Sequence, residues 1–217
     1  LLTTLNSERA AALADYLHEL NSSRDSLERS IQISAKKLLA EFDPANDAAI
    51  VLAHPGWHAG IIGIVAGRLA EKYHRPVVLI AQDELGVKPG IGSVRSVPGF
   101  DVHAALSECS EYLLGYGGHP AAAGLKIEAA QVESFREAFC EYAAKNLRPE
   151  QRTAELWIDA ETTLGCLNLT TVQQIERLAP FGYGNARPLL TASNIQLAEP
   201  PKKIGNDRHL SFRLKQY

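Results

Sequence analysis

The sequence predicts a mixed α/β fold in three parts: a long N-terminal helix, a central α/β domain and a β-rich C-terminal segment. Apolar residues recur about every 3.5 positions over the first 42 residues, the period of a helix that buries one face. From residue 44 to residue 148, short apolar runs alternate with helical patterns, as in a sheet covered by helices. After Pro149 the pattern changes to short alternating segments. We therefore expect a connecting helix over 1–43, an α/β domain over 44–148 and a partial β domain over 149–217.

The N-terminal helix is predicted to start at a cap formed by Ser7 and to end before the cluster Pro44, Asn46 and Asp47. At about 1.5 Å per residue, a helix of about 35 residues exceeds about 50 Å in length. Its apolar stripe consists of Leu13, Leu17, Leu20, Leu27, Ile31, Leu38 and Phe42. Arg24 falls on this stripe, which favours a strut buried along only part of its length over a coiled-coil arm.

The central domain is predicted to alternate strands with helices. The expected strands cover 48–53, 76–81, 87–97 and 125–127, and the expected helices 60–73, 101–114 and 131–146. Two helical faces are expected to point inward, formed by Ile61, Ile64, Val65, Leu69 and Ala70 in the first helix and by Val132, Phe135 and Phe139 in the last. Asp101 is expected to cap the second helix.

The C-terminal segment is predicted to follow a linker at Arg148, Pro149 and Glu150. Strands are expected over 156–160, 189–197 and 209–214, with a short helix over 171–178. Because strand-like alternation continues up to Tyr217, we expect the β domain to be incomplete in this chain.

The composition is that of an ordinary globular protein, with 46% hydrophobic and 22% charged residues. Neither a signal peptide nor a membrane-spanning apolar run is visible in the sequence. The three cysteines, Cys109, Cys140 and Cys166, lack the spacing of a disulfide framework or a zinc knuckle. We therefore expect free thiols and a cytoplasmic location.

Charge is distributed unevenly along the chain. Residues 1–150 carry a net charge of −5, and residues 151–217 a net charge of +2. The basic residues near the C-terminal end are Arg187, Lys202, Lys203, Arg208, Arg213 and Lys215. A local cluster of this kind can neutralise phosphates even on an acidic protein. From charge alone, however, a solvated surface is the favoured interpretation.

The first candidate binding motif is HPGWHAGIIG at residues 54–63, between a predicted strand and a predicted helix. Backbone N–H groups at a helix start lack partners and can bind an anion, and His58 lies near the expected N-cap. The structural alternative is that Trp57 packs in the core, the glycines allow close helix–sheet packing, and His58 only caps the helix.

The second motif is GIGSVRS at residues 90–96, on a predicted strand. Ser93 and Arg95 should project to the same face, because side chains alternate along a strand. A guanidinium beside a hydroxyl suits a phosphate group, which accepts paired charge-assisted hydrogen bonds. A surface arginine on an edge strand is the alternative.

The third motif is GYGGHPAAAG at residues 115–124. Its glycines, followed by Pro120 and small residues, predict a tight turn and one short helical turn that begins at the proline. His119 would then present its ring to a ligand. A turn that carries a surface histidine is the simpler interpretation of this motif alone.

The order of the three motifs resembles the DHHA1 domain that follows the catalytic domain in DHH-family phosphoesterases. Further segments are similar to the RecJ-type single-stranded-DNA-specific exonucleases of that superfamily. They are LNSSR at 20–24, HPGWHAGIIGIVAGRL at 54–69, YHRPVVLIA at 73–81, LAPFGYGN at 178–185 with Pro188, and RHL at 208–210. The resemblance covers essentially the whole chain and implies a long connecting helix, a DHHA1-like domain and a partial OB-type domain.

The resemblance implies a substrate-binding part of a 5′-to-3′ single-stranded-DNA exonuclease that acts in DNA repair and recombination. Phosphate near the 5′ end would bind Ser93, Arg95 and Ser96, and the cleft would be lined by His58, Gly60, Gly117, Gly118 and His119. In the OB-type domain, the basic residues and the aromatic candidates Phe181, Tyr183 and Phe212 would guide the single strand.

In that family, Mn²⁺ or Mg²⁺ ions bound by the DHH domain activate water. This sequence contains no DHH triplet, and its seven histidines lack the acidic neighbours of a two-metal site. They are His18, His54, His58, His74, His103, His119 and His209. We therefore expect no metal ligands and no catalytic residues in this chain, and no nuclease activity from it alone. The partners implied are single-stranded DNA, an N-terminal DHH domain of the same protein and a single-strand-binding protein.

Two alternatives remain at this point. One is a DHH-family phosphoesterase that acts on short oligonucleotides or cyclic dinucleotides, against which the β-rich segment after Pro149 argues. The other is a non-catalytic module that recruits a protein partner, with the long helix as a dimerising coiled coil.

Overall fold

The computed structural model describes residues 3–40, 42–44, 46–205 and 209–216. The chain forms two compact units, Leu1–Ala154 (unit 1) and Glu155–Tyr217 (unit 2). Both helices and sheets are present, in agreement with the predicted α/β class. The three-part division at residues 43 and 148 stays a prediction.

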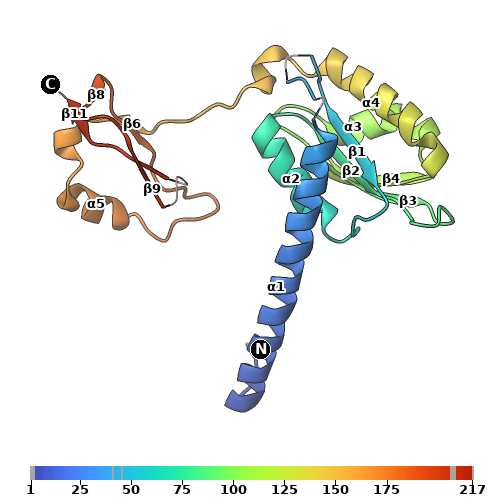
Figure 1. The fold of residues 1–217 in the computed structure, drawn as a ribbon, viewed down its shortest axis with the longest axis horizontal. Coiled ribbons are helices and arrows are strands. Elements are labelled where there is room, and N and C mark those ends of the chain that lie inside the picture. Colours follow the sequence, from blue (N-terminus) through green and yellow to red (C-terminus); the bar gives the residue numbers. More distant parts are fainter. Residues whose placement is uncertain (1–2, 41, 45, 206–208, 217) are drawn as a thin grey trace. The chain divides into compact units, whose positions relative to one another are not determined.

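The first helix, α1, spans Ser7–Leu38 (Figure 1). Its N-cap is Asn6, whose side-chain oxygen accepts a hydrogen bond from the Arg9 backbone at 2.9 Å. The prediction that Ser7 caps the helix is therefore wrong by one residue. Asn6 takes this position because its side-chain carbonyl satisfies one of the N–H groups that a helix start leaves without a partner.

Only the last third of α1 is packed against the rest of unit 1. Ile31 and Ala35 are buried, whereas Leu17, Leu20 and Leu27 are about half exposed. The carboxylate of Glu28, itself buried, pairs with Arg68 of the next helix and accepts a bond from Gln32 at 2.9 Å. The predicted partial burial of the stripe is thus seen, with the contact confined to its C-terminal end.

Unit 1 is built on a five-stranded sheet in the order β1-β2-β3-β5-β4. Its strands are β1 Ile50–His54, β2 Val77–Ala81, β3 Gly90–Arg95, β4 Gly115–His119 and β5 Ala122–Ile127. The β1–β2 pair is parallel, and the other pairs are antiparallel. The helices are α2 Ile62–Tyr73, α3 Val102–Glu108 and α4 Val132–Asn146, with short 3₁₀ turns at Ser110–Tyr112, Ala129–Gln131 and Pro149–Arg152.

Helices cover both faces of the sheet (Figure 1). Alternate residues of β2 separate the two cores: Val77 and Leu79 face α2 and the end of α1, and Val78 and Ile80 face α3 and α4. All of β2 is buried, because it is central and covered on both sides. Phe135 and Phe139 of α4 are fully buried as predicted, and each would cost about 3–5 kcal/mol if truncated to alanine.

The sequence-based elements of unit 1 hold in type and order with three corrections. The helix predicted over 101–114 ends at Glu108 and is followed by the 3₁₀ turn Ser110–Tyr112. Asp101 caps α3 as predicted, accepting bonds from His103 and Ala104. Ile64 is exposed at 37%, so it does not belong to the buried face of α2. Residues 115–119 form strand β4, not a turn followed by a helical turn; Pro120 and Ala121 make a two-residue hairpin loop into β5. Because glycines show no alternation of apolar and polar side chains, this strand could not be predicted from periodicity.

The buried side chain of Arg75 ties several segments of unit 1 together. Its guanidinium donates to the carbonyls of Asp47 (2.8 Å), His74 (2.9 Å), Arg152 (3.0 Å) and Pro44. Burial lowers its pKa, and the carbonyl acceptors offset the cost of desolvating the charge. The connection after α1, the end of α2 and the exit from the domain therefore depend on one residue.

We predict that Arg75→Gln lowers the free energy of unfolding by about 3 kcal/mol, because the carbonyls around the buried guanidinium lose their donor. Urea denaturation of the chain would measure the change. Arg29→Gln, at an exposed position of α1, is the matched control and should change stability by less than about 0.5 kcal/mol. Equal effects of the two variants would contradict the role given to Arg75.

Unit 2 contains helix α5, Leu169–Glu176, and short strands in two-stranded pairs. The pairs are β6 Ala160–Glu161 with β7 Leu190–Thr191, β8 Ile195–Leu197 with β11 Leu214–Gln216, and β9 Lys202–Ile204 with β10 His209–Ser211. The single strands predicted over 189–197 and 209–214 are each divided in two. In the first case Asn194, with φ of 56°, breaks the extended backbone. Only Ala160 of the strand predicted at 156–160 is in a strand, and β9 was not predicted.

Within the described residues, no helix combines the length and apolar character needed to cross a membrane. The three cysteines are free and differ in their surroundings. Burial raises the pKa of Cys109 and of Cys140 to about 11. Cys166 is exposed, and the Thr163 hydroxyl, which donates to its sulfur at 3.3 Å, lowers its pKa.

We predict that iodoacetamide at about pH 8 alkylates Cys166 first, because the thiolate is the reactive form. Peptide mass spectrometry after short exposure would show the order, and Cys166→Ser should abolish the early product. Early labelling of Cys109 would contradict this prediction.

Unfolded thiols ionise below the pKa of about 11 that Cys109 and Cys140 have in the folded chain. Folding stability should therefore fall as pH rises above about 9.

Candidate functional site

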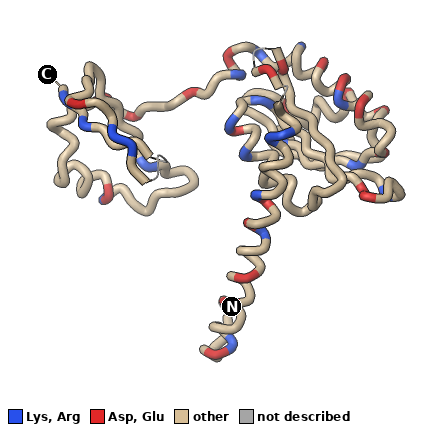
Figure 2. The backbone as a smooth tube through the Cα atoms, viewed as in Figure 1, with Lys and Arg blue, Asp and Glu red and all other residues tan. Residues whose placement is uncertain are grey.

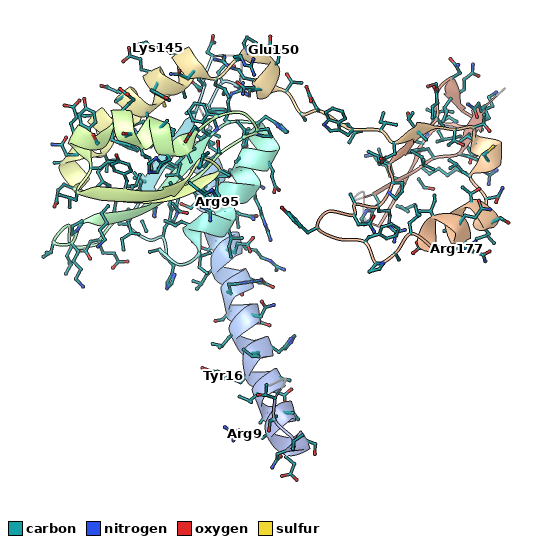
Figure 3. The ribbon with its side chains drawn as sticks, turned by 180° about the vertical axis from the view of Figure 1, so that it is seen from behind. Arg9, Tyr16, Arg95, Lys145, Glu150 and Arg177 are labelled. Carbon is teal, nitrogen blue, oxygen red and sulfur yellow. The ribbon has the colours of Figure 1, made fainter. Side chains whose placement is uncertain are left out.

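The centre of the candidate site is the pair Ser93 and Arg95 on β3. Their side chains lie on one face, as predicted, and Arg95 Nη1 donates to Ser93 Oγ at 3.0 Å and to the Val94 carbonyl at 2.8 Å. Arg95 lies against the start of α2 (Figure 3). A Cβ at Gly63 would stand 2.9 Å from Arg95 Nη2 and 3.0 Å from Ser93 Oγ. Glycine at position 63 therefore lets the helix lie directly on both side chains.

The sheet register extends this site across three strands. Ser93 is in register with Gly124 and Gly117, and Arg95 with Ala122 and His119. Residues in register point to the same face of a sheet. The helix α2 covers this face over β2 and β3, while Gly117, His119 and Gly124 are exposed. We call the uncovered area of β4 and β5, together with the adjoining residues of β3, the open sheet face; its residues are Ile91, Ser93, Arg95, Gly115, Gly117, His119, Ala122, Gly124 and Lys126.

The β4–β5 hairpin that carries His119 is held firmly. Gly118 has φ of 148°, and a Cβ there would collide with the Ala122 carbonyl oxygen, so a side chain does not fit. At the loop, the carbonyls of Pro120 and Ala121 accept bonds from the backbone N–H groups of Val102 (3.1 Å) and Ser96 (3.0 Å). The hairpin is thus fixed to the segment that follows β3.

Three histidines use the same local turn. In each, Nδ1 accepts the backbone N–H two residues later: His54 from Gly56 at 2.9 Å, His58 from Gly60 at 3.1 Å, and His119 from Ala121 at 3.3 Å. The neutral ring then carries its proton on Nε2, which is left to donate outward. His58 and His119 are exposed, and His54 stacks on the buried Trp57 with centroids 5.6 Å apart.

Not all predicted site residues lie on the open sheet face. Ser96 lies beyond the end of β3, and its hydroxyl donates to the Phe100 carbonyl at 2.5 Å, a bond that shapes the following turn. His58 and Gly60 belong to the loop before α2, a few residues ahead of Gly63. The N-cap of α2 is Ile61, so the His58 side chain does not cap the helix. The backbone carbonyl of His58 accepts hydrogen bonds from the N–H groups of Ile61 and Ile62.

The residues that the structure describes do not support a metal site. Among the described residues, no group of three or more His, Cys, Asp or Glu side chains could hold a metal ion. The candidate surface offers donors and cations, which suit an anion, and it lacks the carboxylates that Mg²⁺ and Mn²⁺ prefer. No chemical step is therefore assigned to a metal on this chain.

In unit 2, whose Lys and Arg positions are blue in Figure 2, Lys202 and Lys203 lie in β9 and Lys215 in β11, whereas Arg187 and Arg213 lie outside the strands. Several have acidic partners: Arg187 pairs with Glu176, which raises the pKa of Arg187, and Lys202 lies 3.3 Å from Glu199. Arg208 lies outside the described residues. Of the aromatic candidates, Phe181 is covered by the Arg187 guanidinium at 4.5 Å, whereas Tyr183 and Phe212 are exposed.

Two features of the structure were not singled out from the sequence. Gly63 was part of a quoted motif, but its contact with Arg95 depends on how α2 crosses β3. His54 shares the histidine turn, and the repeated spacing of a histidine two residues before a glycine, at 54–56 and 58–60, was the available signal.

Family models match two parts of the chain. The model of the DHHA1 domain matches residues 46–145, and the model of the RecJ OB domain matches residues 158–217. The single-stranded-DNA-specific exonuclease RecJ of Thermus thermophilus is 38% identical over 216 residues, which cover 99% of this chain. The chain belongs to the RecJ family. The RecJ proteins of Bacillus subtilis (32% identical) and Escherichia coli K12 (30%) also match over 99% of it.

The chain spans about a third of the length of these RecJ relatives, from 27% in Bacillus subtilis to 38% in Escherichia coli. A crystal structure of Thermus thermophilus RecJ in complex with Mg²⁺ matches with a TM-score of 0.80 at 36% identity, over 97% of this chain and 32% of that one. A second, in complex with Mn²⁺, matches with a TM-score of 0.77 over 97% of this chain and 30% of that one. The predicted fold class is confirmed, and RecJ structures hold the metals expected for the family.

We predict that Gly63→Ala displaces the Arg95 guanidinium, because the added Cβ needs the space that Nη2 and Ser93 Oγ occupy. The Arg95 side-chain N–H signal in NMR should shift, while thermal stability should change by less than about 1 kcal/mol, since alanine favours the helix. Gly67→Ala is the matched control one turn later, where a Cβ meets nothing within 4 Å. It should leave the Arg95 signal in place; an equal shift in both variants would refute the contact.

Proposed function

We propose that this chain is the substrate-holding part of a 5′-to-3′ single-stranded-DNA exonuclease that acts in DNA repair and recombination. The observation that carries the proposal is the Ser93–Arg95 pair on the open sheet face. The guanidinium is oriented by a hydroxyl and a carbonyl and has no carboxylate partner among the described residues. A planar cation held in this way is suited to bind a phosphate.

The surroundings of the pair favour a nucleic-acid strand over a free anion. The open sheet face continues from Arg95 across Ala122 to His119, where Nε2 is available as a donor. Gly117 and Gly124 are exposed and have no side chains, so a sugar or a base can approach the backbone of β4 and β5 closely. We assign phosphate near the 5′ end to Ser93 and Arg95, and the adjoining backbone to His58, Gly60, Gly117, Gly118 and His119. Ser96 we assign to the support of the turn after β3.

The same proposal gives catalysis to a part of the protein other than this chain. Hydrolysis would use Mn²⁺ or Mg²⁺ bound by an N-terminal DHH domain, and this chain would present the strand to it. Unit 2 would bind the strand farther along, through Tyr183, Phe212 and the basic residues of its strands. A single-strand-binding protein is a further proposed partner, and free thiols support a cytoplasmic location.

The RecJ OB match over residues 158–217 favours this assignment over a phosphoesterase that acts on cyclic dinucleotides, which was the main alternative. The interaction-module alternative draws on the exposed leucines of α1. It predicts self-association, which sedimentation over a concentration series would reveal.

The test is fluorescence anisotropy of the chain with a labelled single strand that carries a 5′-phosphate, a 5′-hydroxyl strand and a duplex. We expect the phosphorylated single strand to bind best. Arg95→Ala should weaken it about tenfold and reduce the slope of log K against log salt by about 0.7, one phosphate contact. Arg95→Lys keeps the charge without the fork and should fall between the two.

Arg29→Ala, on exposed α1, is the control and should bind as the unchanged chain does. If Arg95→Ala binds all three probes like the unchanged chain, the assignment of Arg95 is wrong.

A further inference from the structure

The open sheet face continues beyond the residues assigned above. A third row lies four residues from Arg95 along β3: Ile91 is in register with Lys126 of β5, and Lys126 with Gly115 of β4. Lys126 and Gly115 are exposed, and Ile91 is 46% exposed. None of these residues has a role in the function proposed above.

Three glycines of the open sheet face are not required by the packing of the chain itself. A Cβ at Gly115 or at Gly117 would meet nothing within 4 Å, and a Cβ at Gly124 would meet only the Gly92 carbonyl oxygen at 3.7 Å. None of the three has a positive φ. Glycine in a strand costs stability, because it has no side chain to pack and more backbone freedom to lose. We therefore attribute these three glycines to a ligand that lies against the backbone of β4 and β5.

The charges of the open sheet face suit an anion. Four cations of unit 1 have carboxylate partners, in the pairs Arg24–Asp25, Arg68–Glu28, Arg136–Glu133 and Lys145–Glu141. Lys126 and Arg95 have no such partner among the residues that the structure describes. The nine residues of the open sheet face include no acidic residue, although residues 1–150 carry a net charge of −5. A polyanion is thus attracted to this face of unit 1.

We propose that Ile91, Lys126 and Gly115 form a second subsite for single-stranded nucleic acid, in which Lys126 binds a phosphate and Ile91 contacts a base. The proposal rests on the function proposed above and extends it. At about 3.3 Å per residue and about 4.8 Å between strands, Lys126 and Arg95 are about 14 Å apart at the backbone. That distance equals about four nucleotides of a stacked strand at about 3.4 Å each, and fewer of an extended one. A strand shorter than this reaches only one of the two cations.

The test compares short and long strands. The probes are 5′-phosphorylated oligothymidylates of about two and about ten nucleotides, the short one measured by competition, with the 217-residue chain over a range of salt. Lys126→Gln should weaken the long strand about fivefold and lower its salt slope by about 0.7, and leave the short strand unchanged. Arg95→Ala should weaken both. Lys145→Gln, on α4 at the opposite face, is the matched control and should change neither.

A second variant tests the open sheet face without removing charge. Gly115→Val adds a β-branched side chain where a Cβ meets nothing, so the unfolding midpoint should stay the same or rise. Affinity for the long strand should fall at least threefold, and affinity for the short strand should not.

Three outcomes overturn the inference. If Lys126→Gln and Gly115→Val bind the long strand like the control while Arg95→Ala still weakens it, the second subsite is wrong and the proposed function stands. If Arg95→Ala has no effect either, both fail. If polyglutamate displaces the long strand with the same dependence on Lys126, the face binds an acidic polypeptide instead.

Discussion

The close contact between α2 and the Ser93–Arg95 pair positions the Arg95 guanidinium beside the uncovered strands β4 and β5. Because Gly63 has no side chain, the helix lies directly on the guanidinium, which also donates to Ser93 Oγ and the Val94 carbonyl. The strands that α2 contacts most are β2 and β3. Two strands are therefore left bare on one face, beside a cation that is already in place. Gly63 therefore affects both the packing of α2 on the sheet and the position of the Arg95 guanidinium.

Much of this arrangement could be predicted from the sequence, and the remainder had a physical reason to be hidden. The buried faces of α2 and α4, the cap at Asp101 and the shared face of Ser93 and Arg95 follow from local periodicity. The strand β4 did not, because its glycines show no alternation and its hydrogen bonds come from β5. The row that joins Arg95 to His119 depends on register, which residues distant in sequence determine together. Family resemblance supplied roles for single residues, but not the surface that joins them.

Glycines serve opposite purposes within a few residues of one another. At Gly118 the backbone conformation and the neighbouring carbonyl exclude a side chain, so glycine is required for folding. At Gly115 and Gly117 the space is free, and glycine costs stability without improving any contact of the chain. A protein under selection for stability alone would place valine or threonine there. The distinction separates structural from ligand-related glycines within one short motif.

The fixation of Arg152 by Arg75 has a mechanical consequence. The carbonyl of Arg152 accepts a bond from the buried guanidinium, two residues before the boundary between the units. A pull on the chain from the C-terminal side of Arg152 is therefore passed to Arg75. That residue is also bonded to the backbone before β1 and at the end of α2. Tension is thereby shared among three segments of unit 1: the chain before β1, the end of α2 and the chain at Arg152.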